Sequence, residues 1–512
     1  MAIVEMAKVM RALREMSSAL GDDRVFFEQQ DRDAYSDQFS WEPERHMPGG
    51  VVAPESQEEV RAAVTIANNN RVPIWPISRG KNLGYGSAAP VMAGSIVMDL
   101  SRMKKIEVDE ENGTVLLEPG VGFFDLYDHL RDNNIPLWLS VPGNSWGSVV
   151  GNALDRGVGY TDYGDHAARI CGVEMVLANG EVVRTGTGAM SNSSTWQLYK
   201  PGFGPSWDTM LCQSNFGVIT KVGMWLMREP QAVAGFDIEC DKPEDLEWLI
   251  DTLAPLRRDG IIQQTPSIGN WLRSASPLTT RDQWAEPGVP LSQSAIDAIR
   301  TEFNVGYWSV STRMYGAAEV VEAKQRVVAK AFENTSAQLT PSSWKTGDDP
   351  EGTPWTGVPI TFPLSNTNWF GGRGGHLGFS PVMPARGDVA MKLFNQASAL
   401  FDEYGFDYHP SFAIGERHMT NVNQILFDRD NAEMTSKIDP LFRQLVTNAA
   451  DEGYSEYRAH IDYMDLIAST FDFGDGALRR MNEKVKDALD PNGIIAPGKS
   501  GIRAREQRGT SS

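Results

Sequence analysis

Cysteine is scarce in this chain of 512 residues, which holds only Cys171, Cys212 and Cys240. These three residues are far apart and no CxxC pair occurs, so the sequence encodes neither a zinc ribbon nor a c-type haem site. Their odd number and wide separation also argue against a disulfide framework, and we expect a cytoplasmic protein in a reducing compartment. No group of His, Asp or Glu has metal-ligand spacing, so no metal is expected.

Positive charge and long apolar runs are also lacking. The 47 Lys and Arg residues stand against 67 Asp and Glu residues, which gives a net charge of -20. This balance argues against nucleic acid as a partner, because a phosphate backbone is bound by clustered Lys and Arg. It argues against an anionic membrane surface for the same reason. No run of about 18 apolar residues occurs, so no membrane-spanning helix is predicted.

Helix and strand signals predict an α+β fold with two principal units. The stretch "GGVVAPESQEEVRAAVTIANNNRVPIWPISRG" combines a short strand, a capping box at Ser56 and Glu59, a helix and a second strand. "CGVEMVLANGEVVRTG" predicts a hairpin that turns at "ANGE". Longer helices such as "GAAEVVEAKQRVVAKAFENT" follow after about residue 235. The Pro- and Gly-rich stretch from Thr340 to Asn368 predicts a long loop.

Three separated segments of the first half are rich in glycine. They are "SRGKNLGYGSAAP", "PGNSWGSVVGNALDRGVGYTDYGDH" and "GFGPSWDTMLCQSNFGVIT". Glycine leaves backbone N–H groups open, and such loops can hold a pyrophosphate. The first segment is neither a Walker A loop nor a GxGxxG motif. Together the segments indicate an extended ligand along the backbone, with a dinucleotide as the natural candidate; the alternative is a strand-rich domain with many turns.

Five motifs follow one another along the chain: "PISRGKNLGYGSAAP", "GSVVGNALDRGVGYTDYGDH", "GGHLGFSP", "EYRAH" and "DPNGIIAPGKSGI". In type and order they resemble the 4-phenol oxidising FAD flavoproteins, the family of vanillyl-alcohol oxidase, eugenol oxidase and 4-cresol dehydrogenase. The resemblance implies a two-domain FAD-binding fold of the PCMH type with an α+β substrate cap. It implies an N-terminal FAD-binding part at residues 1–235, the cap at 236–454 and a C-terminal return to the FAD domain at 455–512.

The resemblance also implies FAD as the cofactor, held covalently through His376. This residue occupies the position that carries the flavin in the oxidases of the family, whereas the dehydrogenase branch uses a tyrosine for which Asn368 offers no substitute. The other expected cofactor-binding residues are Ser78, Arg79, Gly80, Lys81, Asn82, Leu83, Gly84, Pro142, Gly143, Ser148, Gly151, Asn152, Gly157, Tyr160, Gly164, Asp165, Gly217, Ile219 and Lys499.

Tyr85, Tyr457 and Arg458 match the phenolate-binding trio of the family and are the expected catalytic residues. Two hydroxyls and a guanidinium donate charge-assisted hydrogen bonds that favour the phenolate over the phenol. A para-substituted phenolate readily loses hydride from its benzylic carbon to flavin N5, which leaves a quinone methide. The resemblance therefore implies an oxidase of 4-hydroxybenzylic alcohols or 4-alkyl- and 4-alkenylphenols that uses O2 and releases H2O2.

The chain departs from the family beside the expected flavin. Relatives place an aspartate near N5, in a "PDLGxGS"-like stretch, whereas "PGNSWGS" has Gly143 there. The expected base is thus missing, and Asn144, Ser145 or a cap residue are candidates to replace it. The small residues predict a roomy pocket for a bulky, lignin-derived phenol. The expected pocket residues are Gly143, Ser411, Ala413 and Arg417.

Other functions in the same fold stay open at this point. A dehydrogenase would pass its electrons to a protein acceptor that this chain does not contain. A flavin-retaining binding protein without turnover would explain the missing aspartate, and a 2-hydroxy-acid flavin dehydrogenase is disfavoured by the tyrosine pair. The expected partners are a small phenolic substrate and O2, with assembly into a homo-oligomer, a dimer or higher.

Overall fold

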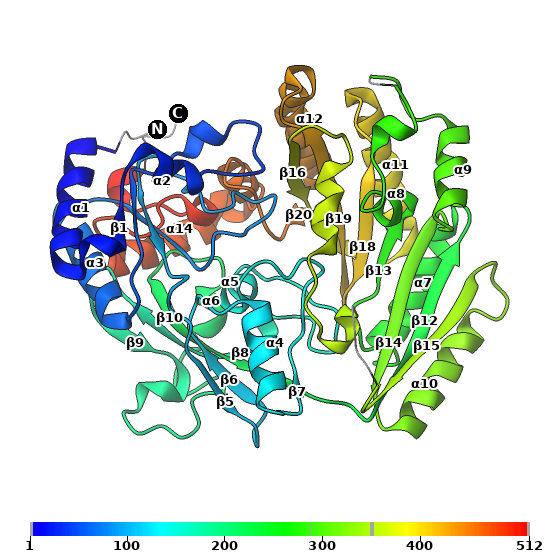
Figure 1. Ribbon diagram of the computed structural model, residues 1–512, viewed down its shortest axis with the longest axis horizontal. Helices are drawn as coiled ribbons and strands as arrows, with labels where there is room; N and C mark the ends of the chain where they lie inside the picture. The colour runs from blue at the N-terminus through cyan, green and yellow to red at the C-terminus, as the bar shows by residue number, and fades with distance from the viewer. Residues whose placement is uncertain (1–3, 287, 349–352, 509–512) are drawn as a thin grey trace.

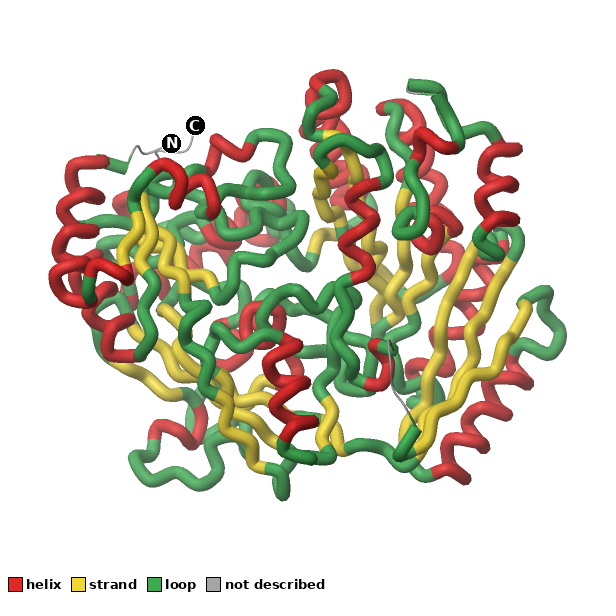
Figure 2. Tube along the Cα trace, in the orientation of Figure 1, coloured by secondary structure: helices red, strands yellow, loops and turns green. Residues whose placement is uncertain are grey.

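The computed structural model describes residues 4–286, 288–348 and 353–508. These residues form two lobes that lie side by side (Figure 1). Both ends of the chain build the first lobe, and the middle of the chain builds the second, which we call the cap. Figure 2 shows strands and helices in both lobes and long loops in the region between the lobes.

A small sheet at the N-terminus follows the predicted strand–helix–strand pattern. Its strand order is β1-β2-β4-β3, and β2, β4 and β3 run parallel. Ser56 caps the helix, because its hydroxyl accepts a hydrogen bond from the backbone N–H of Glu59 at 3.2 Å, as the sequence predicts. The elements are α1 (Met6–Leu20), β1 (Val25–Phe26), α2 (Gln29–Ala34), β2 (Gly50–Val52), α3 (Gln57–Asn70), β3 (Ile74–Ile77) and β4 (Ile96–Asp99).

An antiparallel sheet of five strands completes the core of the first lobe, in the order β5-β6-β10-β8-β9. The predicted hairpin is present, since the backbone N–H of Leu177 donates to the carbonyl of Glu181 across the turn at 2.9 Å. The strands are β5 (Ile106–Asp109), β6 (Thr114–Leu117), β8 (Ile170–Val176), β9 (Val182–Arg184) and β10 (Val218–Trp225). The helices are α4 (Phe123–Asp132), α5 (Val149–Leu154) and α6 (Asp208–Leu211), and β7 (Leu137–Trp138) pairs with β11 (Met227–Arg228).

The cap is a nine-stranded sheet in the order β15-β12-β14-β13-β18-β19-β17-β20, with β16 also paired to β19. Its strands are β12 (Ala232–Cys240), β13 (Ser267–Asn270), β14 (Trp308–Gly316), β15 (Gln338–Lys345), β16 (Gly374–Phe379), β17 (Pro381–Pro384), β18 (His409–Ile414), β19 (His418–Asp428) and β20 (Ser455–Glu456). Its helices are α7 (Asp245–Arg258), α8 (Trp271–Ala275), α9 (Gln293–Glu302), α10 (Ala318–Ala331), α11 (Gly387–Tyr404) and α12 (Ala432–Asp451). Residues of α7, α10, α11 and α12 share one apolar core with the sheet.

The prediction of a long loop from Thr340 to Asn368 is wrong for the first residues of that stretch. Residues 338–345 form β15, which pairs with β12 along its whole length. Pro341 is tolerated in this strand because β15 lies at the edge of the sheet, where one side of the backbone needs no partner. Within the same stretch, residues 362–368 form a 3₁₀ helix, and residues 349–352 lie outside the described residues.

The C-terminal segment returns to the first lobe through α13 (Met464–Ser469) and α14 (Phe473–Leu489). Beyond α14, Ile495 forms a parallel bridge with Ile74 of β3. The cap sheet itself runs from Ala232 to Glu456, because β20 pairs with β17. The domain boundaries at 235/236 and 454/455 remain predictions.

Candidate active site

A cavity of about 1320 Å³ lies where the two lobes meet, and the glycine-rich segments and the cap strands β13, β18 and β19 line it. Of the residues expected to bind cofactor or substrate, all but four line this cavity. The four exceptions are Arg79, Gly84, Gly157 and Gly164. The structure thus brings together residues that are more than 400 positions apart in the sequence, from Ser78 to Lys499.

The four exceptions support the walls of the cavity. Arg79 turns away and its Nη1 donates to the carboxylate of Asp125 at 2.9 Å. A Cβ on Gly84 would lie 2.1 Å from Nδ1 of His376, so glycine is required for this close approach. The other two stabilise loop turns: Gly157 packs against Asn152, and the Gly164 carbonyl accepts from the N–H of Gly159 at 2.8 Å.

The first two glycine-rich loops are joined by a pair of serines. The Ser148 hydroxyl caps α5 by accepting from the N–H of Gly151 at 2.9 Å, and it donates to the Ser78 hydroxyl at 2.7 Å. A Cβ on Gly151 would lie 2.4 Å from the Ser78 Oγ atom, which explains the glycine there. The two loops therefore form one continuous glycine-lined wall.

His376 lies on β16 with 6% of its surface exposed. Neither ring nitrogen has a hydrogen-bond partner, although both are buried. Burial, followed by the nearby Arg273 cation, lowers the pKa of His376 to about 3. The imidazole is consequently neutral at physiological pH, and a nitrogen lone pair is free to bond to a group placed in the cavity.

Tyr85, Tyr457 and Arg458 line the cavity side by side. Arg458 Nη2 donates to the Tyr457 hydroxyl at 3.2 Å, and its guanidinium carbon lies 4.7 Å from the centre of the Tyr85 ring. Burial raises the pKa of Tyr85, and Tyr457 adds to that shift. Burial also lowers the pKa of Arg458, but the tyrosines and Asp155 outweigh it and the net pKa is raised. The trio therefore groups two hydroxyls around one buried cation.

The hydroxyl of Tyr160 occupies the space that a side chain at position 143 would fill. A Cβ on Gly143 would lie 2.9 Å from the hydroxyl oxygen of Tyr160. A larger side chain at position 143 would thus collide with that hydroxyl unless Tyr160 moved. Tyr160 is held by its backbone, whose N–H donates to the Val141 carbonyl at 3.1 Å.

On the cap side, alternate residues of strand β18 form the cavity wall. Ser411 and Ala413 of β18 line the cavity, while Phe412 and Ile414 point to the opposite face and pack into the cap core. Arg417 also lines the cavity but is exposed, and its Nη1 donates to the Glu416 carbonyl at 2.9 Å. The pocket wall is therefore small and polar close to β18 and charged near the solvent.

A buried ionic network ties the N-terminal segment to the "EYRAH" motif. His460 Nε2 lies 2.8 Å from Asp37 Oδ2, and its Nδ1 lies 3.3 Å from Asp462 Oδ2. Asp462 also accepts from His46 at 2.9 Å. Although burial opposes it, these carboxylates raise the pKa of His460 to about 9. Sequence reasoning missed this network, because its members are separated by more than 400 residues.

Comparison with known proteins places the chain in a family. The FAD binding domain family matches residues 48–186, and the C-terminal domain family of FAD linked oxidases matches residues 315–500. The flavoprotein subunit of 4-cresol dehydrogenase (hydroxylating) from Pseudomonas putida is 36% identical over 501 residues, or 96% of this chain and 95% of that protein. The chain belongs to the FAD-linked oxidase family of 4-cresol dehydrogenase.

Solved structures of this family agree with the fold described above. A 4-ethylphenol oxidase from Gulosibacter chungangensis, in complex with isoeugenol, gives a TM-score of 0.94 at 33% identity and covers 99% of each chain. A p-cresol methylhydroxylase with substrate bound gives 0.92 at 36% identity and covers 98% of each chain. These findings confirm the predicted family and the two-domain fold of the PCMH type.

This member of the FAD-linked oxidases is a flavin-dependent oxidoreductase, and FAD is its cofactor. The cavity suits FAD, because the glycine-lined wall exposes backbone amides and the imidazole of His376 has no partner of its own. In the described residues, no group of three or more His, Cys, Asp or Glu side chains is arranged to hold a metal ion. No described helix is long and apolar enough to cross a membrane.

Proposed function

We propose that this enzyme oxidises para-substituted phenols at the benzylic carbon, with O2 as the electron acceptor. The observation that carries the proposal is the convergence of Tyr85, Tyr457 and Arg458 in a cavity that also contains the unpartnered His376. When bound, FAD supplies the acceptor for the hydride of the substrate. His376 is proposed to hold it by a covalent bond, since its neutral imidazole is available as a nucleophile.

The buried trio would bind the substrate as its phenolate. Arg458 keeps its charge at any pH, and the two tyrosines donate hydrogen bonds from neutral hydroxyls. Lowering a phenol pKa from about 10 to about 7 in this way corresponds to roughly 4 kcal/mol of preference for the anion. The negative charge pushes electron density toward the para carbon, so that loss of hydride leaves a neutral quinone methide from the substrate. Ser411 and Ala413 leave room for the rest of the para side chain.

The choice of acceptor rests on His376. A histidine is present where the resemblance predicts the flavin link of the oxidases, and the 4-ethylphenol oxidase covers 99% of this chain. The second candidate is a dehydrogenase that passes electrons to a protein, because the 36% identical relative is described as a flavoprotein subunit. Oxygen uptake with 4-ethylphenol and the purified protein alone separates the two, since only an oxidase consumes O2 without an added acceptor.

Anaerobic addition of 4-ethylphenol to the purified yellow protein should bleach its flavin absorbance, and this experiment tests the proposal. After acid precipitation the colour should stay with the protein and map to the peptide that contains His376. His376→Ala should release the colour into the acid supernatant. A flavin that 4-ethylphenol does not bleach would rule out phenol oxidation, and colour released from the wild-type protein would rule out the covalent bond.

We further propose that the Tyr160 hydroxyl takes the place of the aspartate that relatives carry near N5. Tyr160→Phe should lower kcat for 4-ethylphenol about 100-fold, the size typical for loss of a group that handles protons. KM and flavin retention should change little, because the ring stays in place. The measurement is product formation in a rapidly quenched single turnover, because the base acts on the quinone methide after the hydride has left. A rate within about twofold of the wild type would remove Tyr160 from the role.

A further inference from the structure

Arg273 is a cavity residue that the trio and the cofactor do not explain. It lies on the short helix α8 of the cap and lines the cavity. Its Nη1 atom is buried and has no hydrogen-bond partner. Among the described residues, no carboxylate lies within ion-pair distance of its guanidinium, which leaves a cation in the interior without an anion.

Two other buried arginines of the cap are paired, whereas Arg257, which also lines the cavity, forms no ion pair among the described residues. Arg281 Nε lies 2.6 Å from Asp407, and Arg313 Nη2 lies 2.8 Å from Asp237. Pairing is expected, because an isolated charge is costly to bury and arginine does not lose its proton. Burial lowers the pKa of Arg273, as expected for a cation without a counter-ion. The missing partner of Arg273 is therefore a feature of the cavity and not of the cap in general.

Four neighbouring groups interact electrostatically with Arg273, which itself lines the cavity. They are Tyr160 and Tyr85, together with His376 and His409. None of these is a carboxylate, and burial keeps both histidines neutral. Arg273 lines the same cavity as Gly143, Tyr160 and Tyr85, so a phenol bound at Arg458 would share this cavity with its guanidinium.

We propose that Arg273 binds a carboxylate on the para side chain of the substrate. The preferred substrates are then 4-hydroxyphenyl compounds that carry an acid, and the pocket holds two anionic groups, the phenolate at Arg458 and the carboxylate at Arg273. A planar guanidinium suits a carboxylate, because it can donate two parallel hydrogen bonds. This assignment rests on the proposed phenol oxidation and specifies its substrate class.

The test compares 3-(4-hydroxyphenyl)propanoate with its amide, which has the same shape and no charge. The wild-type holoenzyme should show a 10- to 100-fold higher kcat/KM for the acid, mostly through KM, the range expected for a hydrogen bond to a charged group. Arg273→Met should abolish this preference and leave kcat/KM for the amide within about threefold. Arg273→Lys should keep part of the preference. Arg443→Gln, which removes an exposed cation from α12, should keep all of it.

Three results would overturn the assignment. One is a wild-type enzyme that does not prefer the acid, and another is an Arg273→Met enzyme that keeps the preference. The third is loss of flavin from Arg273→Met, which would assign Arg273 to the cofactor. Failure of phenol oxidation itself is recognised separately, because 4-ethylphenol would then leave the flavin unbleached. In that case anaerobic calorimetry of the same pair still tests Arg273 by binding alone.

Discussion

Replacing Arg458 with Leu should lower kcat/KM for 4-ethylphenol about 1,000-fold at pH 7. The guanidinium is the only cation of the trio, so its removal takes away most of the pKa shift of the bound phenol together with a charge-assisted hydrogen bond that holds the phenolate; a fall of about 1,000-fold corresponds to roughly 4 kcal/mol. The two tyrosines remain but cannot supply a positive charge. The measurement is steady-state kinetics over a pH range from about 6 to 10.

The sign of the pH effect follows from the same contact. Arg458 lowers the pKa of the bound phenol, so in its absence ionisation needs a higher pH. Activity of Arg458→Leu should therefore rise toward pH 10, where a free phenol ionises in water. Tyr457→Phe keeps the cation and should shift the profile less. A pH profile with an unchanged midpoint in Arg458→Leu, at full flavin content, would contradict phenolate binding at this residue.

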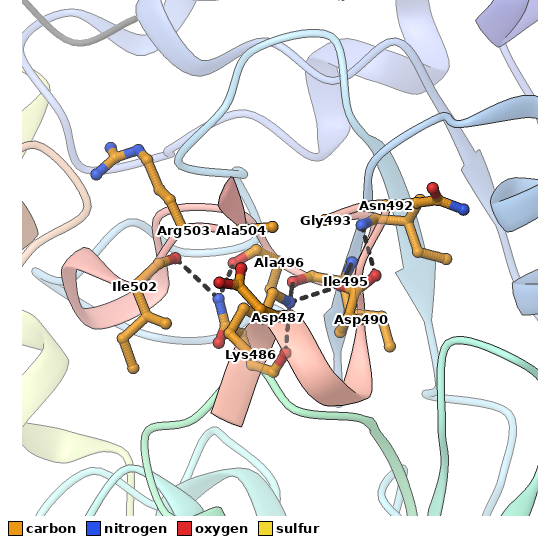
Figure 3. Close-up of polar contacts among 12 residues, drawn as sticks. Lys486, Asp487, Asp490, Asn492, Gly493, Ile495, Ala496, Ile502, Arg503 and Ala504 are labelled. Atoms are coloured by element: carbon orange, nitrogen blue, oxygen red, sulfur yellow. Dashed lines mark hydrogen bonds and ion pairs between the residues drawn. The ribbon is translucent and has the colours of Figure 1, made fainter. Parts of the chain in front are cut away.

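Lys486→Met should lower the free energy of unfolding by about 3 to 5 kcal/mol, the usual cost of breaking a buried ion pair. Lys486 is 0% exposed, and its ammonium donates to the carbonyls of Asn215 and Ile495, both at 2.7 Å. It also donates to the carboxylate of Asp490 at 2.6 Å. Figure 3 shows this cation among the turns that follow α14. Its removal leaves a buried carboxylate and two carbonyls without their donor.

The matched control lies two residues earlier on the same helix. Lys484 is exposed, so Lys484→Met should change the free energy of unfolding by less than about 0.5 kcal/mol. Lys486→Met combined with Asp490→Asn should recover part of the loss, because the amide removes the unpaired buried charge while its oxygen can still accept from the backbone N–H of Ile494 or Ile495. Urea unfolding followed by flavin fluorescence and by circular dichroism measures all three variants. Equal stability of the two single variants would show that the buried ion pair contributes nothing.

The sequence predicted those features that local patterns encode. Three features depend on neighbours within a few positions, and the structure contains all of them. They are the helix N-cap at Ser56, the hairpin at Leu177–Glu181 and helix α10. The glycine-rich sequence "GGHLGFSP" around His376 is likewise a local motif. Family resemblance added the fold and the cofactor, which the comparisons confirm.

The features that were missed depend on distant partners. β15 was predicted as loop because its proline and polar residues form a strand only beside β12, about 100 positions earlier. Arg273 looks like an ordinary helix residue in "NWLRSAS", since nothing local reveals that it lacks a counter-ion. The Tyr160 hydroxyl was assigned to the cofactor, and only the folded chain shows it above Gly143.

Because the C-terminal segment completes the first lobe, this lobe can finish folding only after the cap has been synthesised. Ile495 completes an edge beside Ile74, and Lys486 fastens the same segment to Asn215. A ribosome makes these residues after the entire cap has emerged, so the N-terminal sheets wait through translation of more than 200 residues for their final partners. The dinucleotide site therefore matures only after the cap has been made, and until then the strand that contains Ile74 lacks its last partner.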